Sequence, residues 1–221
     1  MSATTRTDQR PDVHEMVVIH RVFRREFVAI PALVRRVAEG DTARVRLLSD
    51  HARLILAGLH MHHTGEDEVL WPLLLERAAP STGLVETMQA QHHRVDEYAD
   101  QLDTLLAAWV ALPTPLRAEQ LAQVVERFAE ALFEHLDLEE REILPLVSRH
   151  VTVAEWGSLG EHGKDSMSAR QLPLMFGSIL EDADEGERSR MLAHLPAPIR
   201  LVMRTIGARQ YRRYISRVRA G

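Results

Sequence analysis

Two short blocks of this sequence share a spacing of side chains that can bind metal ions. His62 and Glu66 are four residues apart, and so are His135 and Glu139, at an offset of 73 residues (62 to 135) without a gap. Side chains at this spacing lie on the same face of an α-helix. The repeat therefore predicts two imidazoles and two carboxylates that converge on one point inside a helical bundle.

The apolar periodicity indicates which other histidines face inward. Four segments show the three- and four-residue steps of a buried helical stripe, and each stripe contains one histidine. Two neighbouring buried carboxylates are costly unless a cation neutralises them. Nitrogen and carboxylate oxygen donors without sulfur suit iron and, less well, manganese. The sequence thus predicts a pair of metal ions held by His20, His62, Glu66, His92, His135 and Glu139.

Beyond the two glutamates, the same periodicity predicts how the inward face continues. On the second segment it runs through Val69 and Leu73. On the fourth it runs through either Glu142 or Ile143 and then through Leu146.

The histidines that lie outside these stripes are predicted to be solvated or to hydrogen-bond to metal ligands: His14, His51, His60, His63 and His93. The local stripe favours His92 over His93, although the repeat offset (20 + 73) maps His20 onto His93. Asp67 and Glu140, beside the inward glutamates, are expected to be solvated or to hydrogen-bond to ligands. An exchange between Glu139 and Glu140 as the ligand stays open.

The elements that would position these residues are helices. Helical periodicity covers nearly the whole chain and no alternating strand pattern is present, so we expect an all-α fold. Long helices are predicted over residues 12–40, 42–79, 82–112 and 114–150. Short connections make neighbouring helices antiparallel, which predicts an up-down-up-down four-helix bundle over residues 12–150.

Local signals set the ends of these helices. Asp12-x-x-Glu15 is a capping box at the start of the first helix, and Gly40 is expected to stop it. Thr114 followed by Pro115 marks the start of the fourth.

Residues 151–221 are expected to form a short helical extension that packs on the bundle. Thr152-x-x-Glu155 and Asp184-x-x-Glu187 are candidate capping boxes within it.

The last predicted helix, residues 198–219, is strongly basic. It has no acidic residue, and Tyr211 and Tyr214 lie among its arginines: Arg200, Arg204, Arg209, Arg212, Arg213, Arg217 and Arg219. One interpretation is a docking surface for an acidic protein partner or for nucleic acid. The other is a solvated face paired with the acidic stretch 181–187.

Composition narrows the classes of protein. The chain of 221 residues has no cysteine, which excludes disulfides, iron–sulfur clusters and thiolate zinc sites. Its formal net charge of −5 argues against a general nucleic-acid binder. It contains no apolar run long enough for a membrane span. Residues 1–11 are polar and do not resemble a signal peptide, so we expect a cytoplasmic protein.

Taken together, these residues resemble the hemerythrin-like, or HHE cation-binding, family over about residues 13–149. The resemblance rests on the six predicted ligands and on the segments after the two glutamates, which end at Pro72 and Pro145. It implies a four-helix bundle with a non-haem, oxo- or hydroxo-bridged pair of iron ions, for which manganese or zinc can substitute. It also implies interaction with dioxygen, peroxide or nitric oxide.

The sequence departs from the oxygen-carrying hemerythrins in two places. Those proteins have two histidines four apart on the third helix, where this chain pairs His92 with Asp96. They also end with a histidine and an aspartate five apart, where this chain has His135 and Glu139. One imidazole fewer predicts a more open and more anionic site. Greater carboxylate character stabilises the ferric state and favours redox turnover, sensing or iron handling over oxygen carriage.

Three functions remain open at this point. The first is redox chemistry with a small oxidant, such as catalase-like disproportionation of peroxide. The second is a sensor of oxygen, nitric oxide or iron, or an iron-binding module without turnover, that signals through the C-terminal extension. The third is an interaction protein with a vestigial site. No phosphate-binding glycine loop or nucleophile elbow is present to indicate a transferase or hydrolase.

Overall fold

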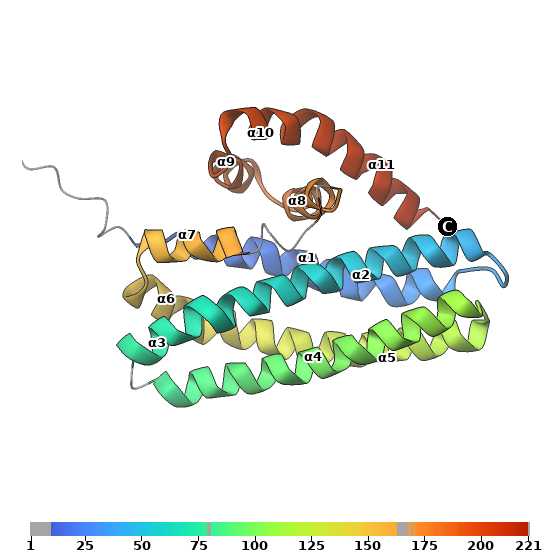
Figure 1. The fold of residues 1–221 in the computed structure, drawn as a ribbon, viewed down its shortest axis with the longest axis horizontal. Helices are drawn as coiled ribbons and strands as arrows, with labels where there is room; N and C mark the ends of the chain where they lie inside the picture. Colours follow the sequence, from blue (N-terminus) through green and yellow to red (C-terminus); the bar gives the residue numbers. More distant parts are fainter. Residues whose placement is uncertain (1–9, 79–80, 163–167, 169, 221) are drawn as a thin grey trace, which may run out of the picture.

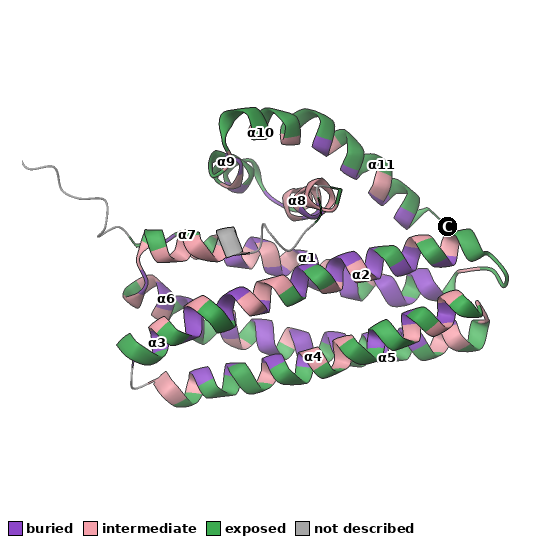
Figure 2. Ribbon diagram, viewed as in Figure 1, coloured by how far each residue is buried: buried purple, intermediate pink, exposed green. Residues whose placement is uncertain are grey.

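The computed structural model describes residues 10–78, 81–162, 168 and 170–220. Every regular element in these residues is a helix. Four long helices lie side by side as a bundle (Figure 1): α1 (His14–Arg35), α2 (Thr42–Gly65), α4 (Thr82–Ala111) and α5 (Pro115–Leu138). Their apolar stripes face one another, so buried residues concentrate on the inner faces (Figure 2). Phe27 of α1 meets Phe128 of α5 edge to face, with ring centroids 4.6 Å apart.

The predicted helix starts near residues 42, 82 and 114 are confirmed. Thr114 caps α5, since its hydroxyl accepts a hydrogen bond from the backbone N–H of Arg117. The fourth long helical run ends at His150 as predicted. The predicted end of the second at residue 79 lies outside the described residues.

Both predicted ends of the first helix are wrong. Asp12 Oδ1 accepts from the backbone N–H of His14 at 3.2 Å and forms no capping box, so α1 begins at His14. α1 already ends at Arg35. Gly40 lies in the following turn with φ at +81°, a conformation that glycine adopts readily.

The two helices that carry the His-x-x-x-Glu spacing widen into a π-helical turn at the glutamate. These turns are η2 (Glu66–Leu70) and η4 (Glu139–Ile143), and they continue into α3 (Trp71–Arg77) and α6 (Leu144–His150). Pro72 and Pro145 are the second residues of α3 and α6. Proline has no N–H, and its ring clashes with the carbonyl four residues back in an α-helix. The wider π turn accommodates both effects.

The π turns correct the predicted inward face, because each shifts the helical phase by one residue. Val69, Leu73 and Leu146 are only half-buried, and Glu142 is exposed. Of the two alternatives on the fourth segment, Ile143 is confirmed as the inward residue, and Leu70, Leu74 and Val147 face inward in place of Val69, Leu73 and Leu146.

The remaining helices form a layer against α1 and α2 (Figure 1): α7 (Val153–His162), α8 (Leu172–Glu181), α9 (Glu185–Ala193), α10 (Ala197–Val202), the π turn η5 (Met203–Gly207) and α11 (Ala208–Arg219). Both capping boxes predicted here form, at Thr152 and at Asp184. Met175 of α8 and Tyr211 and Ile215 of α11 join the apolar core of the bundle.

Candidate metal centre

The structure gathers two adjoining groups of potential metal ligands between the bundle helices. The first consists of His20 from α1, His62 from α2 and Glu139 from η4. His20 Nε2 lies 3.1 Å from His62 Nε2 and 3.3 Å from Glu139 Oε2. Three donor atoms from three helices therefore converge on one small volume.

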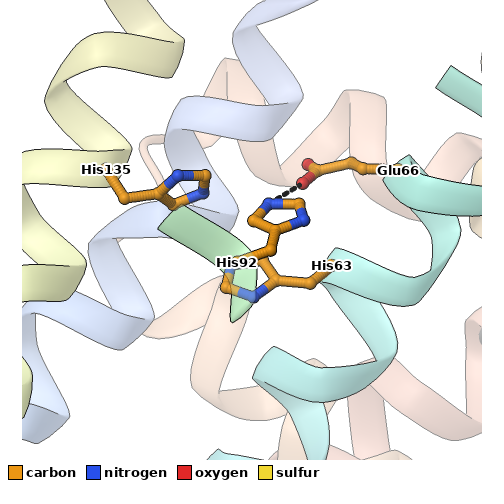
Figure 3. Close-up of side chains that lie close together, drawn as sticks. All are labelled: His63, Glu66, His92 and His135. Atoms are coloured by element: carbon orange, nitrogen blue, oxygen red, sulfur yellow. Dashed lines mark ion pairs between the residues drawn. The ribbon is translucent and has the colours of Figure 1, made fainter. Parts of the chain in front are cut away.

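The second group consists of His63, Glu66, His92 and His135 (Figure 3). His92 Nε2 lies 3.3 Å from Glu66 Oε2, and the ring of His63 stacks on that of His92. The donor atoms of this group all lie within 4.8 Å of one another. The groups are linked, because His62 Nε2 of the first lies 3.4 Å from Glu66 Oε1 of the second.

The donor atoms are buried and largely without hydrogen bonds. The atoms that have no hydrogen-bond partner among the described residues are both oxygens of Glu66 and of Glu139, both ring nitrogens of His63, and Nε2 of His92 and His135. The contacts of 3.3 to 3.8 Å between these histidines and glutamates lack hydrogen-bond geometry. Buried polar atoms without partners cost folding free energy. Cations coordinated by these atoms would satisfy them, so the residues fit a metal pair.

Side-chain oxygens of neighbouring residues contact the Nδ1 atoms of three histidines and fix the orientation of their rings. His20 Nδ1 donates to Glu140 Oε1 at 2.9 Å, and His92 Nδ1 donates to Asp67 Oδ1 at 2.9 Å. His135 Nδ1 lies 3.2 Å from Gln91 Oε1. With Nδ1 protonated, each ring directs its Nε2 lone pair into the cluster, which is how histidines bind metals in proteins.

Burial and charge shift the pKa values of these groups in opposite directions. Burial, reinforced by the neighbouring charge of His20, lowers the pKa of His62 to about 3. Burial disfavours the charged form of His20 and would lower its pKa. The Glu139 carboxylate has the larger effect and raises the pKa of His20 to about 9. Burial and the nearby Glu139 raise the pKa of Glu66 to about 8. At neutral pH the chain alone therefore retains buried protons, which cations displace when they bind.

All six residues predicted as ligands are brought together here. His92 is buried within the cluster, whereas the side chain of His93 is 79% exposed on the helix surface. Glu139 lies inside the cluster, and Glu140 lies behind His20 as a hydrogen-bond partner. His60 is exposed as predicted.

The predictions for His63 and His51 are wrong. His63 belongs to the second ligand group and is buried. The sequence offered one signal for it, since His63 and Glu66 are three residues apart and share a helix face. His51 is buried away from the cluster, where it lies 3.1 Å from Glu26 and 3.0 Å from the hydroxyl of Tyr214.

The expected loss of one imidazole also needs correction. Asp96 stands apart from the cluster, 3.9 Å from the exposed His60, so it replaces no ligand in space. His63 brings a fifth imidazole to the two groups from the helix that already carries His62. With five imidazoles in the two groups, the site has no missing imidazole that would leave it more open.

None of the helices in the described part of the chain has the length and apolar character needed to cross a membrane.

The chain was compared with proteins of known sequence and structure. No solved structure matches the chain significantly. The Uncharacterized protein Rv2633c of Mycobacterium tuberculosis is 32% identical over 152 residues, which span 67% of this chain and 82% of the relative. The Uncharacterized protein Mb2666c of Mycobacterium bovis matches with the same identity and coverage.

The family model described as "Hemerythrin HHE cation binding domain" matches residues 12–147. This range contains all seven residues of the two ligand groups. The chain therefore belongs to the hemerythrin HHE cation-binding family.

Proposed function

We propose that this chain is a non-haem di-iron protein, built on an up-down-up-down four-helix bundle, that reacts with dioxygen, peroxide or nitric oxide. Redox turnover rather than oxygen carriage is its main activity in this proposal. Residues 12–150 form the metal-binding domain and residues 151–221 the extension. The proposal rests on one observation above all: seven donors in two adjoining groups include two buried carboxylates without hydrogen-bond partners.

The ligand assignment follows from the positions of these donors. His20, His62 and Glu139 would hold one ion, and His63, His92 and His135 with Glu66 the other. Glu66 lies close to His62 as well as to His92, so its carboxylate is placed to serve both ions. When bound, two iron ions supply the two electrons that cleavage of an O–O bond requires.

The chain's own residues favour the oxidised state of such a centre. The carboxylates of Asp67 and Glu140 hydrogen-bond to His92 and His20 and make these imidazoles more basic ligands. More basic ligands stabilise a higher metal charge. Redox turnover is thus favoured by these two hydrogen-bonded carboxylates and not by a missing imidazole.

Apolar side chains limit the access of water to the cluster. The ring of Phe23 lies 5.5 Å from that of His62, and Trp71 lies 5.6 Å from His92. Among the seven donors, His62 has the most exposed side chain, at 7%. The side of the cluster at His62 is therefore the approach that we assign to a small oxidant.

Purification from iron-supplemented cells, with metal quantification and visible spectra before and after peroxide, tests the proposal. We expect about two irons per chain and an absorption band that is lost in His62→Ala and Glu139→Ala. His93→Ala is the matched control, because His93 is exposed beside His92. Oxygen release on peroxide addition supports turnover. Stably folded protein without iron, or with only manganese or zinc, contradicts the iron assignment.

A second candidate is a sensor or iron-binding module without turnover, and one contact favours it. α7 of the extension packs on η2 beside the ligands. A Cβ atom at Gly65 would lie 3.7 Å from the side chain of Leu159, so α7 approaches the ligand helix closely. A spectral response to nitric oxide or oxygen without peroxide turnover, together with a change in proteolysis of the extension, would support this reading.

A further inference from the structure

The most basic and the most apolar exposed surfaces of the described residues coincide on one arm of the extension, defined here as residues 197–219 (α10, η5 and α11). Four of its aliphatic side chains are exposed: Ile199, Leu201, Val202 and Ile206. Such a concentration on one short segment is typical of a surface that another molecule covers. Figure 2 shows α10 and the start of the following helix as largely exposed.

Most arginines of the arm also form no ion pair with any residue that the structure describes. Arg219 pairs with Glu181, and Arg200 donates to a backbone carbonyl. The expected pairing of the whole basic face with residues 181–187 is therefore wrong for most of its members. The exposed arginines with no ion pair to any described residue are Arg204, Arg209, Arg212, Arg213 and Arg217.

A shallow groove runs along this arm, with a volume of about 380 Å³. Arg209, Arg213 and Arg217 line it at four-residue intervals, and Ile206 lies at one end. Successive arginines are thus separated by roughly 6 Å along the helix. The arm thus presents a row of positive charges next to the patch formed by its exposed aliphatic side chains.

A second groove, of about 480 Å³, has the complementary character and lies between α2 and α4. Asp96, Asp100 and Asp103 line it, and Leu56 and Leu59 supply apolar surface. Arg53 also lines it and pairs with Asp103, so the acidic character of the groove comes from Asp96 and Asp100. Asp96 and Asp100 repeat the four-residue spacing of the arginines on the arm. No described side chain forms an ion pair with Asp100, and within the described part of the chain the only ion-pair approach to Asp96 is that of His60 at 3.9 Å.

The two grooves do not meet within one chain. The arm lies on the side of the bundle formed by α1 and α2, whereas α4 lies on the opposite side (Figure 1). Outside residues 197–219, which carry seven arginines and no acidic residue, the chain has a formal net charge of −12 (−5 minus 7). Attraction to a large anionic surface is therefore opposed by the rest of the molecule, whereas a second copy offers a local acidic groove.

We propose that the arm docks into the α2–α4 groove of a second copy of this chain. Each copy carries both surfaces, so two copies can exchange the contact reciprocally about a two-fold axis. Reciprocity doubles the buried area, and a stable interface needs ~1,000 Å² in total. This inference goes beyond the proposed function and does not depend on bound metal.

Charge reversal with the full chain tests the proposal. Sedimentation velocity should show self-association of the natural chain that weakens as salt screens the charges. Arg209→Asp with Arg213→Asp, or Asp96→Arg with Asp100→Arg, should each raise the dissociation constant by about 100-fold, because like charges then face each other. The dissociation constant should not change in the control variants Arg212→Asp and Glu86→Arg, because both positions are exposed and line neither groove.

Mixing the two charge-reversed proteins gives the sharpest outcome. In a pair of one copy of each, both contacts again join opposite charges, so a one-to-one complex should form although neither protein self-associates. A variant that merely misfolds would not be rescued in this way. A natural chain that stays monomeric, or association that neither reversal changes, overturns the proposal. Binding of a monomeric chain to anionic vesicles that is lost only in the arm variant would also overturn it and identify a membrane partner.

Discussion

The imidazole ring of His63 stacks on that of His92, with ring centroids 4.0 Å apart and ring planes within 13° of parallel. Neither ring nitrogen of His63 has a hydrogen-bond partner in the described part of the chain, although the side chain is buried. A histidine that serves only packing would leave two polar atoms unsatisfied. Its position beside Glu66 and His135 instead gives these atoms a use as metal donors.

Substitution of His63 by alanine should lower the bound iron by about one ion per chain. The reason is that His63 belongs to only one of the two ligand groups. The metal-free variant should unfold at a similar denaturant concentration to the natural chain, since loss of packing is offset by removal of unsatisfied polar atoms. Metal analysis and urea denaturation measure the two effects, with His60→Ala as the exposed control. Full iron content in His63→Ala would show that His63 is not a ligand.

Glu140→Gln should weaken metal binding by about 10- to 100-fold while leaving the fold intact. Glu140 accepts the Nδ1 proton of His20, and an amide would no longer increase the basicity of the ring or hold its orientation as strongly. Competition with a chelator measures the affinity. Glu142→Gln is the matched control, because Glu142 is exposed and pairs with Arg141. Equal affinities for the two variants would contradict a supporting role for Glu140.

Two glycines should respond to alanine in opposite directions. A Cβ atom at Gly177 would overlap the Cβ and ring of Tyr211, so Gly177→Ala should destabilise the chain by about 1–3 kcal/mol through overpacking of α8 against α11. A Cβ atom at Gly157 would meet no described atom within 4 Å, so Gly157→Ala should stabilise the chain by about 0.5–1 kcal/mol. Urea denaturation of both variants distinguishes the effects. A neutral Gly177→Ala would mean that α8 and α11 are not packed as described.

Acid should loosen the contact between the bundle and α11 through Glu26. Burial would raise the pKa of this carboxyl, but His51 and Arg25 outweigh burial and lower it from 4.5 to about 2, and Arg219 lies 3.4 Å away. A lowered pKa means that the stabilisation is complete above pH 4.5 and is lost as the pH falls towards 2. The shift corresponds to about 3 kcal/mol.

The metal-free chain is the material for this test, so that acid release of metal does not interfere. Stability of the natural chain should fall more steeply between pH 5 and pH 2.5 than that of Glu26→Gln. Glu119→Gln, which removes an exposed partner of Arg35, should keep the natural slope. Parallel curves for the natural chain and Glu26→Gln would exclude this role.

The sequence predicted the helices well where proline, threonine and the apolar stripe all indicate the same boundary. Thr114 and Pro115 begin α5 as expected, and the inward stripe of α4 carries His92. The inward face beyond Glu66 was predicted one residue out of phase, since a strict 3.6-residue period cannot represent a π turn. Pro72 was the visible signal of that irregularity.

The six predicted ligands could be found because each lies on a stripe that local periodicity reveals. His63 lies about 100° around the helix from His62, and only the arrival of His92 and His135 from other helices buries it. His51 is buried by Tyr214, which is 163 residues away in the sequence. Contacts of this range leave no local pattern in the sequence.

The two π turns place a constraint on how such chains can change length. Each turn holds one residue more than an α-helical path would, so losing a single residue between Glu66 and Pro72 would rotate α3 by about 100° relative to the ligands. The same applies between Glu139 and Pro145. The connections at residues 36–41 and 112–114 lie outside these turns and tolerate insertions at little cost. Both turns share one register at an offset of 73 residues, but His63 is a donor and its counterpart is Leu136, so residues 62–77 and 135–150 are not interchangeable and a recombination that replaced the first by the second would remove one imidazole from the centre.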